Sequence, residues 1–157
     1  MKLAGAILIR PFIEETGPDM EHSFFDAEFE CISPIVPEIS SIDKDKLYIC
    51  GLEQALSIAP KAAGTYFLAV TKEKPKSRIP ENVMVLVTDL SRDDVYFRME
   101  DHFLSIIRWI EEMKEAVLYG ASLQELVDMS EDIIGQYINI SDYGFRLLAH
   151  TRHIPCH

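Results

Sequence analysis

Cysteine and positive charge are both scarce in this 157-residue chain. The three cysteines, Cys31, Cys50 and Cys156, lie far apart and form no C-x-x-C pair. This spacing argues against a disulfide framework and fits a reducing cytosol. Lys and Arg number 15 against 26 Asp and Glu, which gives a net charge of −11. Because a phosphate backbone is bound mainly through Lys and Arg, we expect no binding to nucleic acid or to an anionic membrane surface.

Long apolar runs are absent as well. The run between Lys2 and Arg10 is only seven residues long, and no small-residue cleavage site follows it. It therefore predicts a buried strand at residues 3–9 and not a signal peptide. No run approaches the roughly 20 residues that span a bilayer. We expect a cytoplasmic protein.

Motifs of common enzyme classes are also missing, since the chain has no G-x-S-x-G, P-loop or G-x-G-x-x-G sequence. His150, His153, Cys156 and His157 crowd the C-terminus, but Pro155 breaks any helix that would align them as metal ligands. Acidic residues occur in adjacent pairs, which point about 100° apart on a helix and predict solvated faces. We expect no metal, no cofactor and no enzymatic activity.

The pattern that is present indicates an α/β fold. Apolar runs bounded by Gly and Pro predict an edge strand at 27–36, strands at 46–50 and 64–70, a central buried strand at 83–88, and a helix at 51–59. A strand, a short helix and a strand in this order predict a βαβ unit. The loop at 71–82 carries four positive charges and two prolines.

Two helices and a hairpin are expected in the second half of the chain. Ser91 and Asp94 form a capping-box pattern that opens a long helix over about 92–119, ended by Gly120. A second helix runs from Ser122 to Gly135, and strands are expected at 137–140 and 145–150. The predicted class is α/β (α+β), with a small mixed sheet, a long helix, a second helix and a C-terminal β-hairpin. The predicted divisions are an α/β regulatory domain at 1–90, a helical dimerisation segment at 91–135 and a β-hairpin at 136–157.

The long helix carries an unbroken heptad pattern. Apolar residues are spaced alternately by three and four at Tyr96, Met99, Phe103, Ile106, Ile110, Met113 and Val117. This spacing keeps one apolar seam in register over three heptads and predicts a homodimer through the helix. The alternative is an amphipathic helix that packs on its own sheet.

A ligand site is expected at the carboxyl ends of the strands, where open α/β sheets bind ligands. The residues at these ends are Cys50, Gly51, Thr71, Thr88, Asp89 and Ser91. Gly51 has the alternative role of a tight turn, and Cys50 that of a buried structural thiol.

Residues 109–151 resemble the junction in PucR-type bacterial transcriptional regulators, the purine-catabolism and sugar-diacid regulator group. The matching residues are Trp109, Ser122 to Leu126, Ile133 to Gly135, Ile138 to Asp142, and Phe145 to Ala149. The resemblance implies an N-terminal module that senses or relays a small-molecule effector. It also implies that residues 136–157 are the first strands of a truncated GAF-like domain, and that the DNA-binding helix-turn-helix lies elsewhere.

These observations predict a dimerising regulatory module of a cytoplasmic bacterial transcription regulator. Two other hypotheses remain open. One is a small α/β enzyme with a pocket at the strand ends, and the other is a dimerisation module that binds no ligand.

Overall fold

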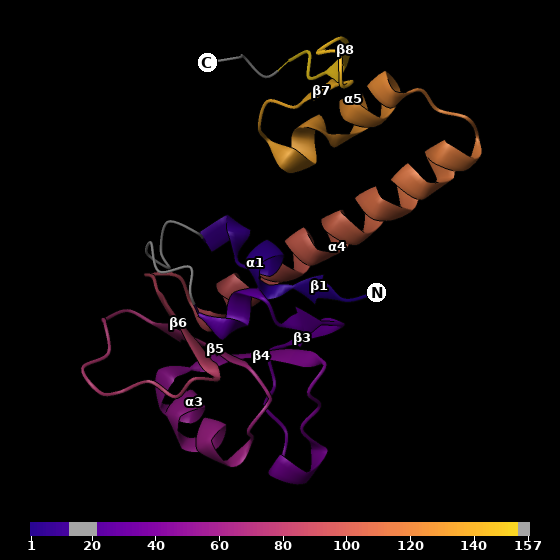
Figure 1. Cartoon of the computed structure of the whole chain (residues 1–157). Helices are drawn as coiled ribbons and strands as arrows, with labels where there is room; N and C mark the ends of the chain where they lie inside the picture. The colour runs from indigo at the N-terminus through magenta and orange to yellow at the C-terminus, as the bar shows by residue number, and fades with distance from the viewer. Residues whose placement is uncertain (13–21, 154–157) are drawn as a thin grey trace. The chain divides into compact units, whose positions relative to one another are not determined.

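The computed structural model describes residues 1–12 and 22–153 of the chain (Figure 1). The chain forms two compact units, residues 1–103 and 104–157. The boundary between these units falls inside helix α4 (Arg92–Leu118). Within the described ranges, no helix combines the length and the apolar character that a membrane crossing requires.

The first unit is built on a four-stranded parallel sheet with the strand order β3-β4-β5-β6. Its strands are β3 (Cys31–Ser33), β4 (Lys46–Gly51), β5 (Phe67–Thr71) and β6 (Val83–Val87). The predicted α/β class is confirmed. In the described part of the chain, antiparallel pairing occurs in two small separate sheets. One pairs β1 (Leu3–Ala4) with β2 (Glu28–Phe29), and the other pairs β7 (Asn139–Ser141) with β8 (Leu147–His150).

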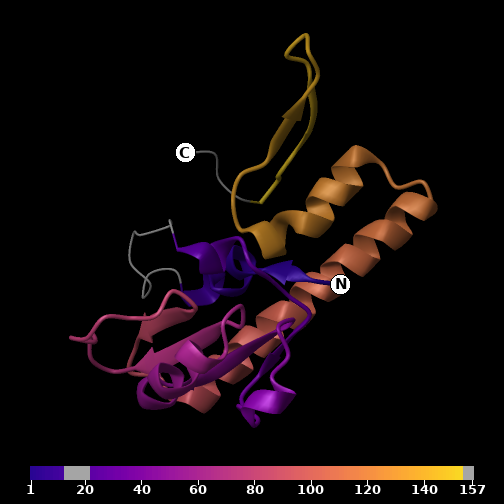
Figure 2. The same ribbon diagram turned by 60° about the horizontal axis from the view of Figure 1, so that its bottom comes forward.

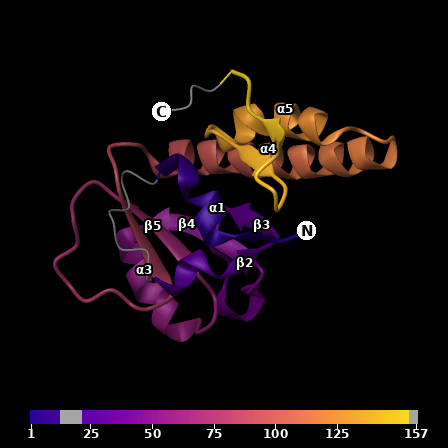
Figure 3. The same ribbon diagram turned by 45° about the horizontal axis from the view of Figure 1, so that its top comes forward.

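The predicted βαβ unit consists of β4, α3 (Leu52–Ile58) and β5. A short 3-10 turn (Ala59–Lys61) follows α3, and its Pro60 ends the helix as expected. Tyr48 and Cys50 of β4 share a buried cluster with Ala55 of α3, whereas Leu47 and Ile49 are also buried but point to the opposite face. Burial on both faces is typical of parallel sheets, and Figure 3 shows α3 on one side of the sheet and the start of α4 on the other.

The predicted strand at residues 3–9 is wrong beyond its first two residues. The run forms β1 (Leu3–Ala4), then α1 (Gly5–Leu8) and a 3-10 turn (Arg10–Phe12). Gly5, Leu8 and Phe12 are all buried, and this spacing follows the period of a helix and not that of a strand. Gly5 also lies so close to the 3-10 turn Ser23–Phe25 that a Cβ there would be 2.0 Å from the Phe24 carbonyl oxygen.

Of two strands whose positions in the sheet were predicted, one lies where it was expected and the other does not. β3 is an edge strand, as Pro34 suggested. β6 is the other edge of the sheet, and not a central strand. Its apolar run is explained by burial, because Val83 faces the α3 side while Met84 and Leu86 are buried on the other side. Coverage of both faces therefore produces a continuous apolar run even at an edge.

The second unit contains the remainder of α4, helix α5 (Leu123–Ile134) and a hairpin of β7 (Asn139–Ser141) and β8 (Leu147–His150), as Figure 2 shows. Ser122 and Glu125 form a complete capping box at the start of α5, and Gly135 ends it with φ 64°. The predicted second helix and C-terminal hairpin are confirmed.

Candidate functional site

The residues predicted as a ligand site lie where the parallel strands end. We call this side of the sheet, at the carboxyl ends of the strands, the strand-end edge. Gly51 pairs with Val70, and Thr71 pairs with Val87. The Thr88 N–H donates to the Thr71 carbonyl oxygen at 2.9 Å, which makes Thr71 and Thr88 neighbours. The parallel register thus brings residues from three strands together, as expected for this edge.

The hydroxyl groups at this edge already take part in local turns and caps. The Thr71 hydroxyl donates to the Glu73 carbonyl at 3.2 Å, and the Thr88 hydroxyl accepts from the Leu90 N–H at 3.2 Å. The Ser91 hydroxyl accepts from the Asp94 N–H at 3.1 Å, which is the first half of the predicted capping box. A ligand here would have to share these groups or displace their local partners.

Cys50 lies in the core next to this edge. Its side chain is fully buried in the cluster with Tyr48 and Phe67, and burial raises the pKa of its thiol to about 11 despite the opposing effect of Arg92. The thiolate is therefore a minor species near neutral pH, and this environment matches the structural role that the sequence left open for Cys50.

Two hollows in the first unit lie near the amino ends of the strands. The sequence did not suggest a site at these ends. One, of about 440 Å³, is lined by residues that include His22, Glu81 and Val83, and the other, of about 390 Å³, includes Tyr66 and again Glu81. His22 accepts from the Phe24 N–H at 3.0 Å through Nδ1 and donates to the Val83 carbonyl at 3.1 Å through Nε2. Both ring nitrogens of His22 are thus engaged in holding the fold.

The heptad seam of α4 divides into two parts. Met99, Phe103 and Ile106 are no more than 7% exposed, so a second copy cannot reach them. In the first unit, the His102 ring also donates to the Ile7 carbonyl of α1 at 2.9 Å. For this half of α4, the expected dimer interface is therefore replaced by packing within the chain. Tyr96 is half-buried and precedes this stretch.

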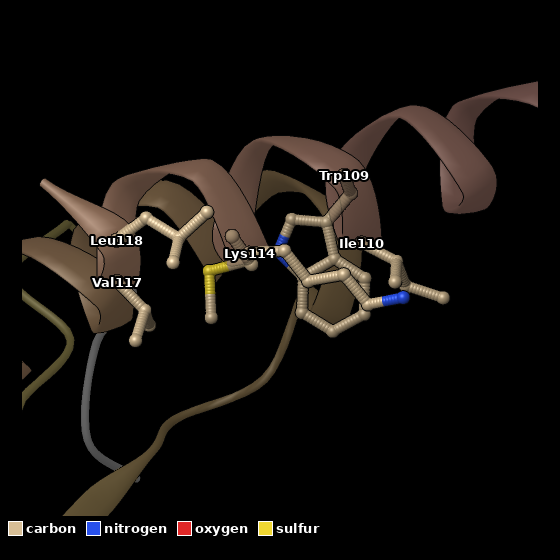
Figure 4. Close-up of a pocket in the computed structure, with 6 residues that line it drawn as sticks. Trp109, Ile110, Lys114, Val117 and Leu118 are labelled. Atoms are coloured by element: carbon tan, nitrogen blue, oxygen red, sulfur yellow. The ribbon is translucent and has the colours of Figure 1, made fainter.

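The second half of the seam is open. Ile110 and Met113 are half-buried, and Val117 is 58% exposed. Together with Trp109, Lys114 and Leu118 they line an apolar groove of about 460 Å³, and Figure 4 shows these side chains on one side of the helix. The sequence identified three of these six residues through their spacing. We call this surface the α4 groove.

A contact to α5 borders the α4 groove on one flank. The Trp109 indole N–H donates to the Ser130 hydroxyl at 3.2 Å, and the same hydroxyl donates to the Leu126 carbonyl at 2.7 Å. The Met113 sulfur lies 3.7 Å from the Ser130 oxygen. Trp109 and Met113 are thus held from the α5 side, whereas the flank of Lys114 and Leu118 is exposed.

Three side chains on one face of α5 hold the C-terminal strap, which we define as residues 150–153. Gln124 makes two hydrogen bonds with the backbone of His150, at 2.7 Å to its carbonyl and at 3.1 Å from its N–H. Gln124 also donates to Asp128 at 2.9 Å, and Asp128 pairs with Arg152 at 3.3 Å. The sequence did not reveal this contact, because residues far apart in the chain supply the two sides.

Glu131 completes this set as a buried carboxylate, only 7% exposed. It accepts hydrogen bonds from the backbone N–H groups of Arg152 and His153, and from the His153 ring at 2.7 Å. The Arg152 N–H and then the His153 side chain lower the pKa of Glu131, while desolvation partly opposes them. Because hydrogen bonds to a carboxylate favour its charged form, Glu131 is ionised at neutral pH.

The histidines of the tail have local partners. His153 bonds Glu131, and the His150 ring donates to the Thr151 carbonyl at 2.8 Å. Cys156 and His157 lie outside the described residues. Among the residues described, no group of three or more His, Cys, Asp and Glu side chains is placed to hold a metal ion.

Comparison with protein-family models, curated proteins and solved structures gives no match for this chain.

Proposed function

We propose that this chain is a dimerising regulatory module of a cytoplasmic bacterial transcription regulator, which binds a small effector or relays its presence and does not catalyse a reaction. The observation that carries the proposal is the α4 groove. It lies on the second half of a helix whose first half buries one face in the α/β unit. One helix thus joins the sheet of the first unit to an open apolar surface.

The continuity of α4 supports a relay. The helix has 27 residues, about 40 Å at 1.5 Å per residue. Val95 and Met99 are fully buried in the first unit, whereas Val117 and Leu118 at the other end are mostly exposed. A ligand that alters how the sheet holds the start of α4 would also alter the position or the stability of the far end, which is the physical requirement for a relay.

The strand-end edge is the proposed position of an effector. The parallel register brings Gly51, Thr71 and Thr88 together there, and Asp89 follows Thr88 in the chain. Arg92 at the start of α4 is close enough to influence the Cys50 thiol beside this edge. A small molecule bound there would contact the sheet and the first turn of α4 together.

The resemblance of residues 109–151 to PucR-type regulators supports the regulatory part of this proposal. Dimerisation fits this role because bacterial operators are commonly two-fold, and a two-fold regulator matches their symmetry. The acidic charge of −11 fits a module that leaves DNA contact to another domain.

A repression assay in bacteria tests the proposal. The chain is fused to a monomeric helix-turn-helix domain that binds its operator only when dimerised by a partner segment. The wild-type chain is expected to restore repression, and Val117→Glu is expected to abolish it by placing a charge in the α4 groove. Arg108→Gln is the matched control, because it changes the net charge by the same amount at an exposed position of α4 outside the groove.

Repression by the wild type and by Arg108→Gln, but not by Val117→Glu, would support the proposal. If the wild-type fusion is expressed at the same level and does not repress, the chain is not a dimerisation module in the cell and the proposal fails.

A further inference from the structure

One flank of the α4 groove contacts α5, and the other flank is exposed to solvent. Trp109 and Met113 are held from the α5 side through Ser130. On the open flank, Val117 is 58% and Leu118 85% exposed, and the next residue, Tyr119, is 84% exposed. Large exposed apolar side chains therefore continue through the last turn of α4 and the residue after it. A surface of this kind is typical of an interaction site.

The apolar spacing continues on the open half of α4. Ile110, Met113 and Val117 extend, at intervals of three and four, the pattern whose buried part ends at Ile106. A straight helix on a globular surface has no need of a strict seven-residue repeat, whereas two helices that supercoil do. The groove therefore fits a helix that carries the same seven-residue repeat, and α4 of a second copy is such a helix.

We propose that the α4 groove binds the α4 groove of a second copy of this chain, with the two helices parallel. This inference rests on the dimerisation proposed above and adds the interface and the direction of the helices. The direction follows from Lys114, the one cationic side chain among the six residues that line the groove.

An antiparallel pair would place the two lysines together. The groove runs from Trp109 to Leu118, so the midpoint of an antiparallel pair centred on it lies between residues 113 and 114. Residue 114 of one copy would then face residue 113 of the other, and the two ammonium groups would lie near the two-fold axis between apolar side chains. Like charges at close range in such a setting repel strongly, because little water screens them.

A parallel pair separates the two lysines. If Ile110 and Val117 lie in the core of the seam, Lys114 lies at a position that flanks the core. In a parallel pair this position faces the flanking position on the other helix that is five residues earlier in the sequence, and that residue is Trp109. Each ammonium group can then lie against an indole ring, a favourable cation–π arrangement. The hydrogen bond from Trp109 to Ser130 already holds that ring in place.

Disulfide trapping of the whole chain distinguishes the two directions. Ile110→Cys and Val117→Cys are made separately in a background with Cys31→Ser and Cys156→Ser, while the fully buried Cys50 is kept. A parallel pair brings each new cysteine next to its own copy, so each variant is expected to form a covalent dimer alone. In an antiparallel pair, like positions are displaced by seven residues, about 10 Å along the axis, which exceeds the reach of a disulfide. Only a mixture of the two variants would then cross-link.

Glu115→Cys serves as the control, because Glu115 is exposed and does not line the groove, and it is expected not to cross-link. A second measurement mixes wild-type chain with Lys114→Glu. A parallel pair is expected to form mixed dimers in the statistical proportion, because the two positions lie on opposite flanks. An antiparallel pair would favour the mixed dimer.

Cross-linking of each single variant together with statistical mixing would support the proposal. Cross-linking of the mixture alone, or a preference for mixed dimers, would overturn the parallel direction and leave the dimer in place. A dimer in sedimentation without cross-linking in any variant would show that the α4 groove is not the interface. A monomer at about 100 µM, where even a weak dimer of Kd near 10 µM would be largely associated, would overturn this inference and the proposed dimerisation together.

Discussion

Gln124 of α5 holds the backbone of His150 in β8 through two hydrogen bonds made by a single side-chain amide, at 2.7 and 3.1 Å. One residue therefore satisfies both a carbonyl and an N–H of the strand that ends the hairpin. A two-stranded hairpin is at best marginally stable in water, so a tie of this kind to a helix is important for the second unit.

Replacement of Gln124 by Leu is expected to destabilise the second unit by about 1–3 kcal/mol, because two half-buried backbone groups of His150 lose their partner. The helix propensities of Leu and Gln are similar, so the change tests the hydrogen bonds and not α5 itself. Urea unfolding and hydrogen exchange of the His150 amide measure the effect. Gln54→Leu, on the exposed side of α3, is the control and is expected to be nearly neutral. Equal stability of the two variants would contradict the role of Gln124.

Glu131 predicts a loss of stability in acid. Its pKa is lowered in the folded chain, first by the Arg152 N–H and then by His153. A lowered folded pKa gives stability that is present above the unfolded pKa of about 4.3 and is lost as the pH falls through the folded value. The stability advantage of the wild type over Glu131→Gln should therefore shrink as the pH is lowered from about 6 to 3. Glu115→Gln, on the exposed surface of α4, is expected to show little change over this range.

Met99 and Val117 belong to the same heptad seam but should respond differently to truncation. Met99→Ala removes a fully buried side chain, and we expect it to destabilise the protomer by about 2–5 kcal/mol. Val117→Ala, at a position that is 58% exposed, should change protomer stability by roughly 0.5 kcal/mol or less and should weaken self-association instead. Urea unfolding at low concentration and sedimentation at high concentration separate the two effects. Loss of association on Met99→Ala at full protomer stability would contradict this division of α4.

Gly5 and Gly51 make a second contrasting pair. A Cβ at Gly5 would lie 2.0 Å from the backbone oxygen of Phe24, so Gly5→Ala must displace the 3-10 turn and is expected to cost at least about 1–3 kcal/mol. A Cβ at Gly51 meets no heavy atom within 4 Å, and φ at Gly51 is −71°. Gly51→Ala should therefore leave thermal stability nearly unchanged. A large loss at Gly51 would mean that a tight turn there requires glycine.

The helices and strands with strong local signals could be predicted from the sequence. The capping box at Ser122 and Glu125, the stop at Gly135 and the apolar runs of β4 and β6 are all encoded within a few residues. The run at residues 3–9 was predicted as a strand because it is short and almost wholly apolar, and such a run does not by itself distinguish a helix from a strand. The need for glycine at residue 5 comes from a distant neighbour, because the Phe24 carbonyl oxygen lies where a Cβ would be.

Burial along α4 shows the second limit of sequence reasoning. Met99 and Val117 both belong to the heptad pattern, yet one is fully buried and the other is mostly exposed. A periodic pattern reports that a face is apolar, but it does not report along which part of the helix the chain itself covers that face. The same limit hid the contact between α5 and the C-terminal strap, since Gln124 and His150 are 26 residues apart.

The contact between α5 and the strap has an evolutionary consequence. Gln124 and Glu131 bind mainly backbone groups of residues 150–153, and backbone groups are the same in nearly every amino acid. Replacement of the exposed Arg152 side chain should therefore be tolerated better than replacement of Gln124 or Glu131, whereas Thr151, which is 3% exposed and accepts from the Ile138 N–H through its hydroxyl, should also resist change. The outer side of the strap can then vary in sequence while its backbone keeps its place on α5.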